Sequence, residues 1–189
     1  MNERMNKSLI LVLGGVRSGK SAYADEWAAQ NGHKVLYVAT AQGGDDEMQA
    51  RIERHRASRP ADWHTLEASL NVADAIAQHQ TGYDVILLDC LTVLTANILL
   101  EMPDDITQDD ANAAALTEIE QLLKVYAANE TTWLVVTNEV GMGIVPADAD
   151  TRRYRDLLGR INQRWVDRSA RALLIVAGRA LPLTDPAAP

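Results

Sequence analysis

Residues 14–21, which read GGVRSGKS, combine glycines, a lysine and a hydroxyl in the spacing G-x-x-x-x-G-K-[ST]. Glycines in such a loop let backbone N–H groups turn toward phosphate oxygens. Lys20 can then reach the outer phosphates of a nucleotide, and the Ser21 hydroxyl can ligate Mg²⁺. A glycine-rich turn without a ligand is the alternative, but the apolar run before the loop and the helical pattern after it favour phosphate binding. We predict nucleotide contacts from every loop residue: Gly14, Gly15, Val16, Arg17, Ser18, Gly19, Lys20 and Ser21.

A site of this kind also needs a carboxylate near the metal, at the end of a neighbouring strand. The stretch DVILLDC supplies Asp89 directly after four apolar residues. An aspartate that only caps a strand end is the alternative, but the phosphate loop in the same chain favours a role on the water shell of Mg²⁺. We therefore predict Ser21 and Asp89 as the metal-side residues.

The stretch ARIERHRASRP, residues 50–60, is basic within an acidic chain. Read as a helix, it places Arg51, His55 and Arg59 on one face, together with the apolar Met48 and Ile52. A solvated charged helix, or an ordinary hydrogen-bonded histidine, is the alternative. Arginines bind phosphate oxygens in a bidentate fork, and positive neighbours disfavour protonation of an imidazole. A neutral imidazole is a nucleophile, so His55 is a candidate to attack a nucleotide's α-phosphorus.

Composition limits the class of protein. The chain has 189 residues, 47% of them hydrophobic, which suits a single domain over residues 1–189. Acidic residues outnumber basic ones by 26 to 18, and the formal net charge of −8 argues against a general nucleic-acid binder. One cysteine, Cys90, fits a reducing compartment. No apolar run approaches the ~18 residues of a membrane span, and no signal peptide is recognisable, so we expect a cytoplasmic protein.

Short apolar runs alternate with helical patterns, as is typical of an α/β fold with a mainly parallel sheet and flanking helices. The expected strands are residues 9–13, 35–39, 85–89, 133–137 and 172–178, and the expected helices are residues 21–30, 46–59, 70–80, 110–128 and 151–169. Residues 101–110 read as an acidic loop, and 1–7 and 182–189 as loosely ordered ends. In such folds ligands bind at the carboxyl edge of the sheet. The stretch TNEVGMGIVP starts at that edge, where Asn138 and Glu139 indicate a substrate or subunit contact.

Five segments together carry a resemblance to a known family. LGGVRSGKS, VLYVATAQGGDDEM, ARIERHRASRP, ILLDCLT and VTNEVGMGIVP occur in one order over residues 9–178. The chain resembles the adenosylcobinamide kinase / adenosylcobinamide-phosphate guanylyltransferase family, whose bifunctional enzymes take part in cobalamin nucleotide-loop assembly. The resemblance implies a RecA-like P-loop NTPase fold and a homotrimer. Some relatives carry Glu where this chain has Asp89, and either carboxylate can serve a metal.

The resemblance also implies two reactions and a set of contacts. The first phosphorylates adenosylcobinamide with ATP or GTP, and the second transfers GMP from GTP through a histidine intermediate, which matches His55. Beyond the phosphate loop, the family's nucleotide contacts match Ala39, Thr40, Ala41, Arg56, Ala57, Ser58, Arg59, Glu67 and Asp89. No nucleic-acid partner is implied.

Two other functions remain open from the sequence. A P-loop kinase of another small alcohol would use His55 only to bind phosphate, and would form no GMP adduct. A RecA-like ATPase or GTPase acting on a partner such as a nucleic acid is opposed by the acidic charge and by the lack of a basic stripe outside residues 51–60.

Overall fold

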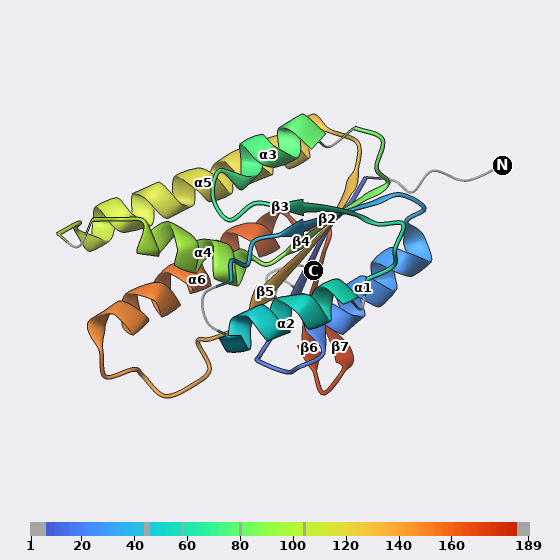
Figure 1. The fold of residues 1–189 in the computed structure, drawn as a ribbon. Coiled ribbons are helices and arrows are strands. Elements are labelled where there is room, and N and C mark those ends of the chain that lie inside the picture. The colour runs from blue at the N-terminus through green and yellow to red at the C-terminus, as the bar shows by residue number, and fades with distance from the viewer. Residues whose placement is uncertain (1–6, 44–45, 58, 80, 104, 185–189) are drawn as a thin grey trace.

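The fold is built on one seven-stranded sheet (Figure 1). A computed structural model describes residues 7–43, 46–57, 59–79, 81–103 and 105–184. The strand order is β3-β2-β4-β5-β1-β6-β7, and every pairing is parallel except that of β6 with β7. The strands are β1 (Leu9–Gly14), β2 (Val35–Ala39), β3 (His64–Glu67), β4 (Val85–Asp89), β5 (Thr132–Asn138), β6 (Arg171–Val176) and β7 (Arg179–Leu183).

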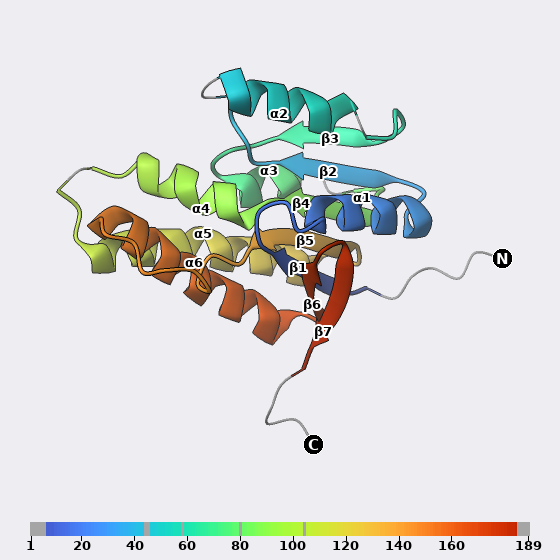
Figure 2. The same cartoon turned by 90° about the horizontal axis from the view of Figure 1, so that it is seen from below.

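Helices cover both faces of the sheet, as a parallel sheet requires. They are α1 (Lys20–Asn31), α2 (Asp46–Ala57), α3 (Val72–His79), α4 (Leu91–Leu100), α5 (Gln108–Ala128) and α6 (Ala149–Arg168). Helices α3 to α6 pack together on one face and α1 lies on the other, while α2 lies next to the edge strand β3 (Figures 1 and 2). None of the described helices is both long and apolar enough to cross a membrane.

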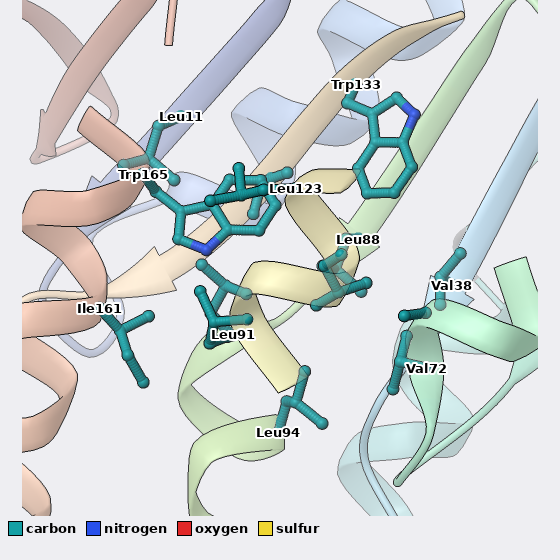
Figure 3. Close-up of a cluster of buried hydrophobic side chains, with 14 of the residues drawn as sticks. Leu11, Val38, Val72, Leu88, Leu91, Leu94, Leu123, Trp133, Ile161 and Trp165 are labelled. Atoms are coloured by element: carbon teal, nitrogen blue, oxygen red, sulfur yellow. The ribbon is translucent and has the colours of Figure 1, made fainter. Parts of the chain in front are cut away.

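The core has two parts because alternate residues of each strand point to opposite faces. In β1, Leu11 packs toward α5 and α6, while Val12 packs toward α1. Figure 3 shows the larger part, where Trp165 of α6 lies close to Leu11. Burial on both faces explains why the central strands read as continuous apolar runs rather than as alternating ones.

The predicted fold class is confirmed, with differences at four elements. The five predicted strands and five predicted helices all form. Three further elements, β3, α4 and β7, are not among the elements expected from the sequence. The run at 172–178 was expected to be one strand, but β6 ends at Val176 and the chain turns back into β7. Pro182 and Leu183 therefore belong to a strand, not to a loose tail; residues 1–6 and 185–189 lie outside the described part.

Candidate active site

The register of the sheet brings the predicted site residues to one edge. Gly14 pairs with Asn138 at the last rung between β1 and β5. Ala39, the last residue of β2, pairs with Asp89 on one side and Glu67 on the other. β3, β2 and β4 therefore end on the same rung, and β5 and β1 continue two residues past it. Together these carboxyl ends form one edge of the sheet, which is where open α/β sheets bind their ligands.

The phosphate loop connects β1 to α1 and depends on its glycines. A side chain at Gly14 would collide with the Ser18 hydroxyl and approach the Ile175 carbonyl oxygen to 2.9 Å. Gly19 has a φ of 95°, a left-handed conformation that other residues rarely adopt. Within the loop, the Lys20 ammonium donates to the Gly15 carbonyl oxygen at 3.2 Å. The loop thus bends back on itself, so that Lys20 stays at its mouth.

The start of α1 fits an anion. Its first turn contains no acidic residue, and no side chain caps Gly19, so the positive end of the helix is open to an acceptor. The Ser18 hydroxyl is buried and has no hydrogen-bond partner within the described residues. A phosphate group is the kind of acceptor that such donors are suited to bind.

The β6–β7 turn supports the loop from behind, a role that sequence reasoning missed. Ala177 and Gly178 both have positive φ, 49° and 73°, as in a tight type I′ hairpin turn. The Gly178 amide donates to the Ser18 carbonyl oxygen at 2.8 Å. A side chain at Gly19 would lie 3.1 Å from the Gly178 Cα. In the sequence, the Ala177-Gly178 pair is the signal that could have indicated this turn.

A pocket of about 490 Å³ opens beside the loop, between the sheet edge and α2. It brings together the phosphate-loop lysine and the basic helix, which lie 35 positions apart at Lys20 and His55. The predicted site residues that line it are Lys20, Ser21, Ala39, Ala41, His55, Arg56, Arg59, Glu67 and Asp89. The lining that sequence reasoning did not single out includes Tyr37, Gln42, Gln49 and Cys90.

Several predicted residues do not line this pocket. Thr40 is fully buried, and its hydroxyl accepts from the Cys90 amide at 2.8 Å and donates to the Cys90 carbonyl at 2.9 Å. Thr40 thus joins the end of β2 to the chain after β4. Ala57 and loop residues 14–19 also lie outside the lining, while Ser58 and the Arg51 side chain fall outside the described part.

Helix α2 is held over the pocket by the predicted residues themselves. Arg56 forms an ion pair with Glu67 at the end of β3, and both side chains are more than half exposed. The predicted helix extended to residue 59, but α2 ends at Ala57. Arg59 therefore belongs to the segment after the helix. Its guanidinium lies 3.5 Å from the centre of the Tyr37 ring. His55 and Arg59 nevertheless line the same pocket, as the helical spacing led us to expect.

Three buried or partly buried side chains in or near the pocket have raised pKa values. Burial, and then the Asp89 carboxylate, raise the pKa of the Tyr37 phenol, which therefore stays protonated and donates to Asp89 Oδ2 at 2.6 Å. Burial and Asp89 also raise the pKa of Cys90 to about 12, which leaves that thiol a poor nucleophile at neutral pH. Burial and Asp89 raise the pKa of Asp25 to about 6, although Arg59 lowers it.

The residues present fit a magnesium-nucleotide better than a metal held by protein alone. Ser21 and Asp89 line one pocket, and no cluster of three His, Cys, Asp or Glu side chains occurs among the described residues. Mg²⁺ characteristically uses one or two protein oxygens and completes its shell with phosphate oxygens and water.

Comparison with known proteins gives the family. Residues 10–183 match the model of the family described as cobinamide kinase / cobinamide phosphate guanyltransferase. The chain belongs to this family. A bifunctional adenosylcobalamin biosynthesis protein of Pseudomonas aeruginosa is 42% identical over 173 residues, which cover 92% of this chain and 95% of that protein. An Escherichia coli protein of the same description is 38% identical over 175 residues, covering 90% and 96%.

In this member of the cobinamide kinase family, the segment that begins at Asn138 lies beside the pocket. Asn138 lines the pocket, and its Oδ1 is buried without a partner in the described structure. In the loop that follows, Arg155 donates to the carbonyl oxygens of Gly141 and Ile144. The loop thereby exposes the apolar side chain of Ile144. The structure supports the predicted position of Asn138 at the ligand edge of the sheet.

The Asp25 carboxyl predicts a pH-dependent stability. Its pKa is about 6 in the fold and 3.8 ordinarily, so the folded state binds the proton more tightly. Near pH 4 the charge costs little, and above pH 6 the fold carries the full cost of burying it. Asp25→Asn should therefore stabilise the protein near pH 7.5 by on the order of 1–2 kcal/mol, a value discounted for partial exposure. Near pH 4.5 the gain should shrink, and urea unfolding in EDTA at both pH values measures it. An equal gain at both would contradict the assignment.

Proposed function

We propose that this protein is an adenosylcobinamide kinase and an adenosylcobinamide-phosphate guanylyltransferase that uses one nucleotide pocket for both reactions. The observation that carries the proposal is the pocket itself. It is lined by Lys20 of the phosphate loop, His55 of α2 and Asp89 of β4. Family membership and bifunctional relatives identical at 38–42% support the pair of activities.

In the kinase reaction the substrate hydroxyl attacks the γ-phosphorus of ATP or GTP, and the nucleoside diphosphate leaves. This transfer needs positioning and charge stabilisation rather than a protein nucleophile. Lys20 and the amides at the start of α1 would hold the phosphates. Mg²⁺, when bound, would neutralise phosphate charge from a position beside Ser21 and Asp89.

In the guanylyl reaction an imidazole nitrogen of His55 attacks the α-phosphorus of GTP, and pyrophosphate leaves. The phosphate oxygen of the first product then attacks the same phosphorus, which releases His55 and gives adenosylcobinamide-GDP. Arg56 and Arg59 lie on the pocket wall next to His55, where their charge would offset that of the transferring phosphate. Two easier displacements replace one difficult step.

The adduct on the protein is the direct test. Incubation with GTP and Mg²⁺, followed by intact mass measurement, should show addition of one guanylyl group. Addition of adenosylcobinamide phosphate should then remove the group and yield adenosylcobinamide-GDP. A kinase of another small alcohol would show no adduct, so a chain that phosphorylates but never carries GMP would favour that alternative.

The proposal includes three properties that rest on the resemblance and on composition. They are a homotrimer, a cytoplasmic location and a single domain over residues 1–189. Sedimentation equilibrium of the purified protein measures the first of these, with the mass of three chains as the expected result.

Asp89→Asn should raise the Mg²⁺ requirement of both reactions. The carboxylate lines the pocket beside Ser21, and its neutral amide isostere would attract a divalent cation less strongly. The Mg²⁺ concentration at half-maximal rate should rise about tenfold or more, whereas nucleotide affinity measured in EDTA should change little. Asp84→Asn is the matched control, because Asp84 accepts from the backbone of His33 and Lys34, away from the pocket. An unchanged Mg²⁺ titration would leave Asp89 as a plain strand-end residue.

A further inference from the structure

An aromatic ring lies between the two halves of the pocket. Tyr37 is buried, and its hydroxyl donates to Asp89 Oδ2 at 2.6 Å. The Arg59 guanidinium lies 3.5 Å from the centre of the same ring. Trp63 stacks on Tyr37 with 6.3 Å between ring centres and 28° between planes. One side chain therefore contacts both the metal-side carboxylate and the chain segment that leaves α2.

The contacts of Arg59 show that this segment is fixed through the ring. Its Nη1 approaches the Thr65 hydroxyl only at 3.5 Å, and its Nε is buried with no partner among the described residues. Among described side chains, no carboxylate lies within ion-pair distance of it. A guanidinium held in this way depends mainly on the face of the aromatic ring. Four residues before it stands His55, on the last turn of α2.

We propose that Tyr37 and Arg59 are positioning residues that tie the placement of His55 to that of Asp89. The inference rests on the proposed function, because it joins the guanylyl-transfer histidine to the magnesium-side carboxylate. The phenol donates to one carboxylate oxygen and so sets the direction of the other. The ring face holds Arg59 and with it the end of α2. Both nucleotide reactions then use the same arrangement of the phosphate loop, the Asp89 carboxylate and helix α2.

Two substitutions of Tyr37 separate its two contacts. Tyr37→Phe removes only the hydroxyl and keeps the ring under Arg59. The Mg²⁺ concentration at half-maximal rate should rise about three- to tenfold for both reactions, because a hydrogen bond to a charged group is lost. At saturating Mg²⁺ the rate of GMP adduct formation in a single turnover should stay within about twofold of the parent.

Tyr37→Leu removes the ring as well. The same shift in Mg²⁺ requirement should appear, and adduct formation at saturating Mg²⁺ should fall about tenfold or more, since a misplaced nucleophile loses reactivity steeply. The kinase rate at saturating Mg²⁺ should fall less, by about threefold at most. Arg59→Met in the Tyr37→Leu background should add little further loss of adduct formation, because both changes break one contact.

Arg54→Gln is the control for loss of an arginine charge close in sequence to Arg59. Arg54 donates to the Ala50 carbonyl at 3.2 Å, is exposed and does not line the pocket, so its loss should leave both readouts unchanged. If Tyr37→Leu does not fold, the Phe variant and Arg59→Lys carry the test. Arg59→Lys keeps the charge but loses the planar stack, so it should slow adduct formation without shifting the Mg²⁺ requirement.

Two results would overturn the inference. One is an unchanged Mg²⁺ requirement in Tyr37→Phe, and the other is an equal loss of both reactions in Tyr37→Leu with a lowered melting temperature, as a purely structural residue would give. Failure of the proposed function is distinguishable. In that case the parent protein forms no GMP adduct at any Mg²⁺ concentration, whatever the state of Tyr37.

Discussion

His55→Ala should abolish the GMP adduct while the protein still phosphorylates adenosylcobinamide. Guanylyl transfer through a covalent intermediate needs a nucleophile, and phosphoryl transfer to a hydroxyl does not. The adduct should fall below detection, a loss of at least about a thousandfold in rate, whereas kinase turnover should decrease by about tenfold at most. Some kinase loss is expected, since the imidazole lines the wall of the shared pocket.

Acid stability identifies the bond that carries the guanylyl group. A P–N bond to imidazole is labile in acid and stable in alkali, unlike a phosphoester to a hydroxyl. His79→Ala is the matched control, because its ring bonds the Ala75 carbonyl at 2.8 Å and does not line the pocket. It should retain both activities and the adduct. An adduct on the His55→Ala protein, or one that survives acid, would point to another nucleophile and end the assignment.

Lys20→Ala should reduce both reactions together, because they share one phosphate site. Lys20 is largely buried at the mouth of the loop, where a positive charge acts on phosphate with little screening by water. Each rate should fall about a hundredfold or more, equivalent to roughly 3 kcal/mol of transition-state stabilisation. Single-turnover measurements of phosphorylation and of adduct formation, at matched nucleotide saturation, give the two losses separately.

The control for Lys20 is a lysine elsewhere on the surface. Lys124 is exposed on α5, so Lys124→Ala should leave both rates unchanged. Circular dichroism of Lys20→Ala should match that of the parent, because the ammonium contributes a bond to the Gly15 carbonyl rather than core packing. Normal turnover of either reaction in a folded Lys20→Ala protein would remove that reaction from the phosphate loop.

Much of the site could be predicted because its residue types occur at spacings that are recognisable in the sequence. The phosphate loop has fixed spacing, and Asp89 stands where an apolar run ends. The carboxyl-edge rule then places His55 near both without any coordinates. The structure supports this expectation by putting Lys20, His55 and Asp89 on one pocket.

Elements whose residues lack periodic patterning could not be predicted. β3 is four residues long and only partly buried, so it has no apolar run to detect. α4 is apolar almost all round because it is packed between β5, α5 and α6, and its period is therefore hidden. β7 contains Pro182, which sequence rules assign to a strand only at an edge, and β7 is the edge strand.

Contacts between distant residues were also beyond sequence reasoning. Tyr37 reads as one more apolar position in VLYVA, and its hydroxyl has meaning only beside Asp89. Thr40 matches a nucleotide contact implied by the family resemblance, and its hydroxyl bond to Cys90 in the buried interior could not be read from the sequence. These roles depend on which strands become neighbours, and neighbour order is decided by the packing of the whole sheet.

The strand order of the sheet has a consequence for the nascent chain on the ribosome, where the amino terminus emerges first. β1 (Leu9–Gly14) ends up between β5 and β6, both of which are translated more than a hundred residues later. Until then it is an apolar strand with two open edges, a template for wrong pairing. The phosphate loop after β1 is completed later still, because the Gly178 amide that donates to its Ser18 carbonyl is translated after β6. A chain released before that glycine would carry its complete nucleotide motif and lack the turn that supports it.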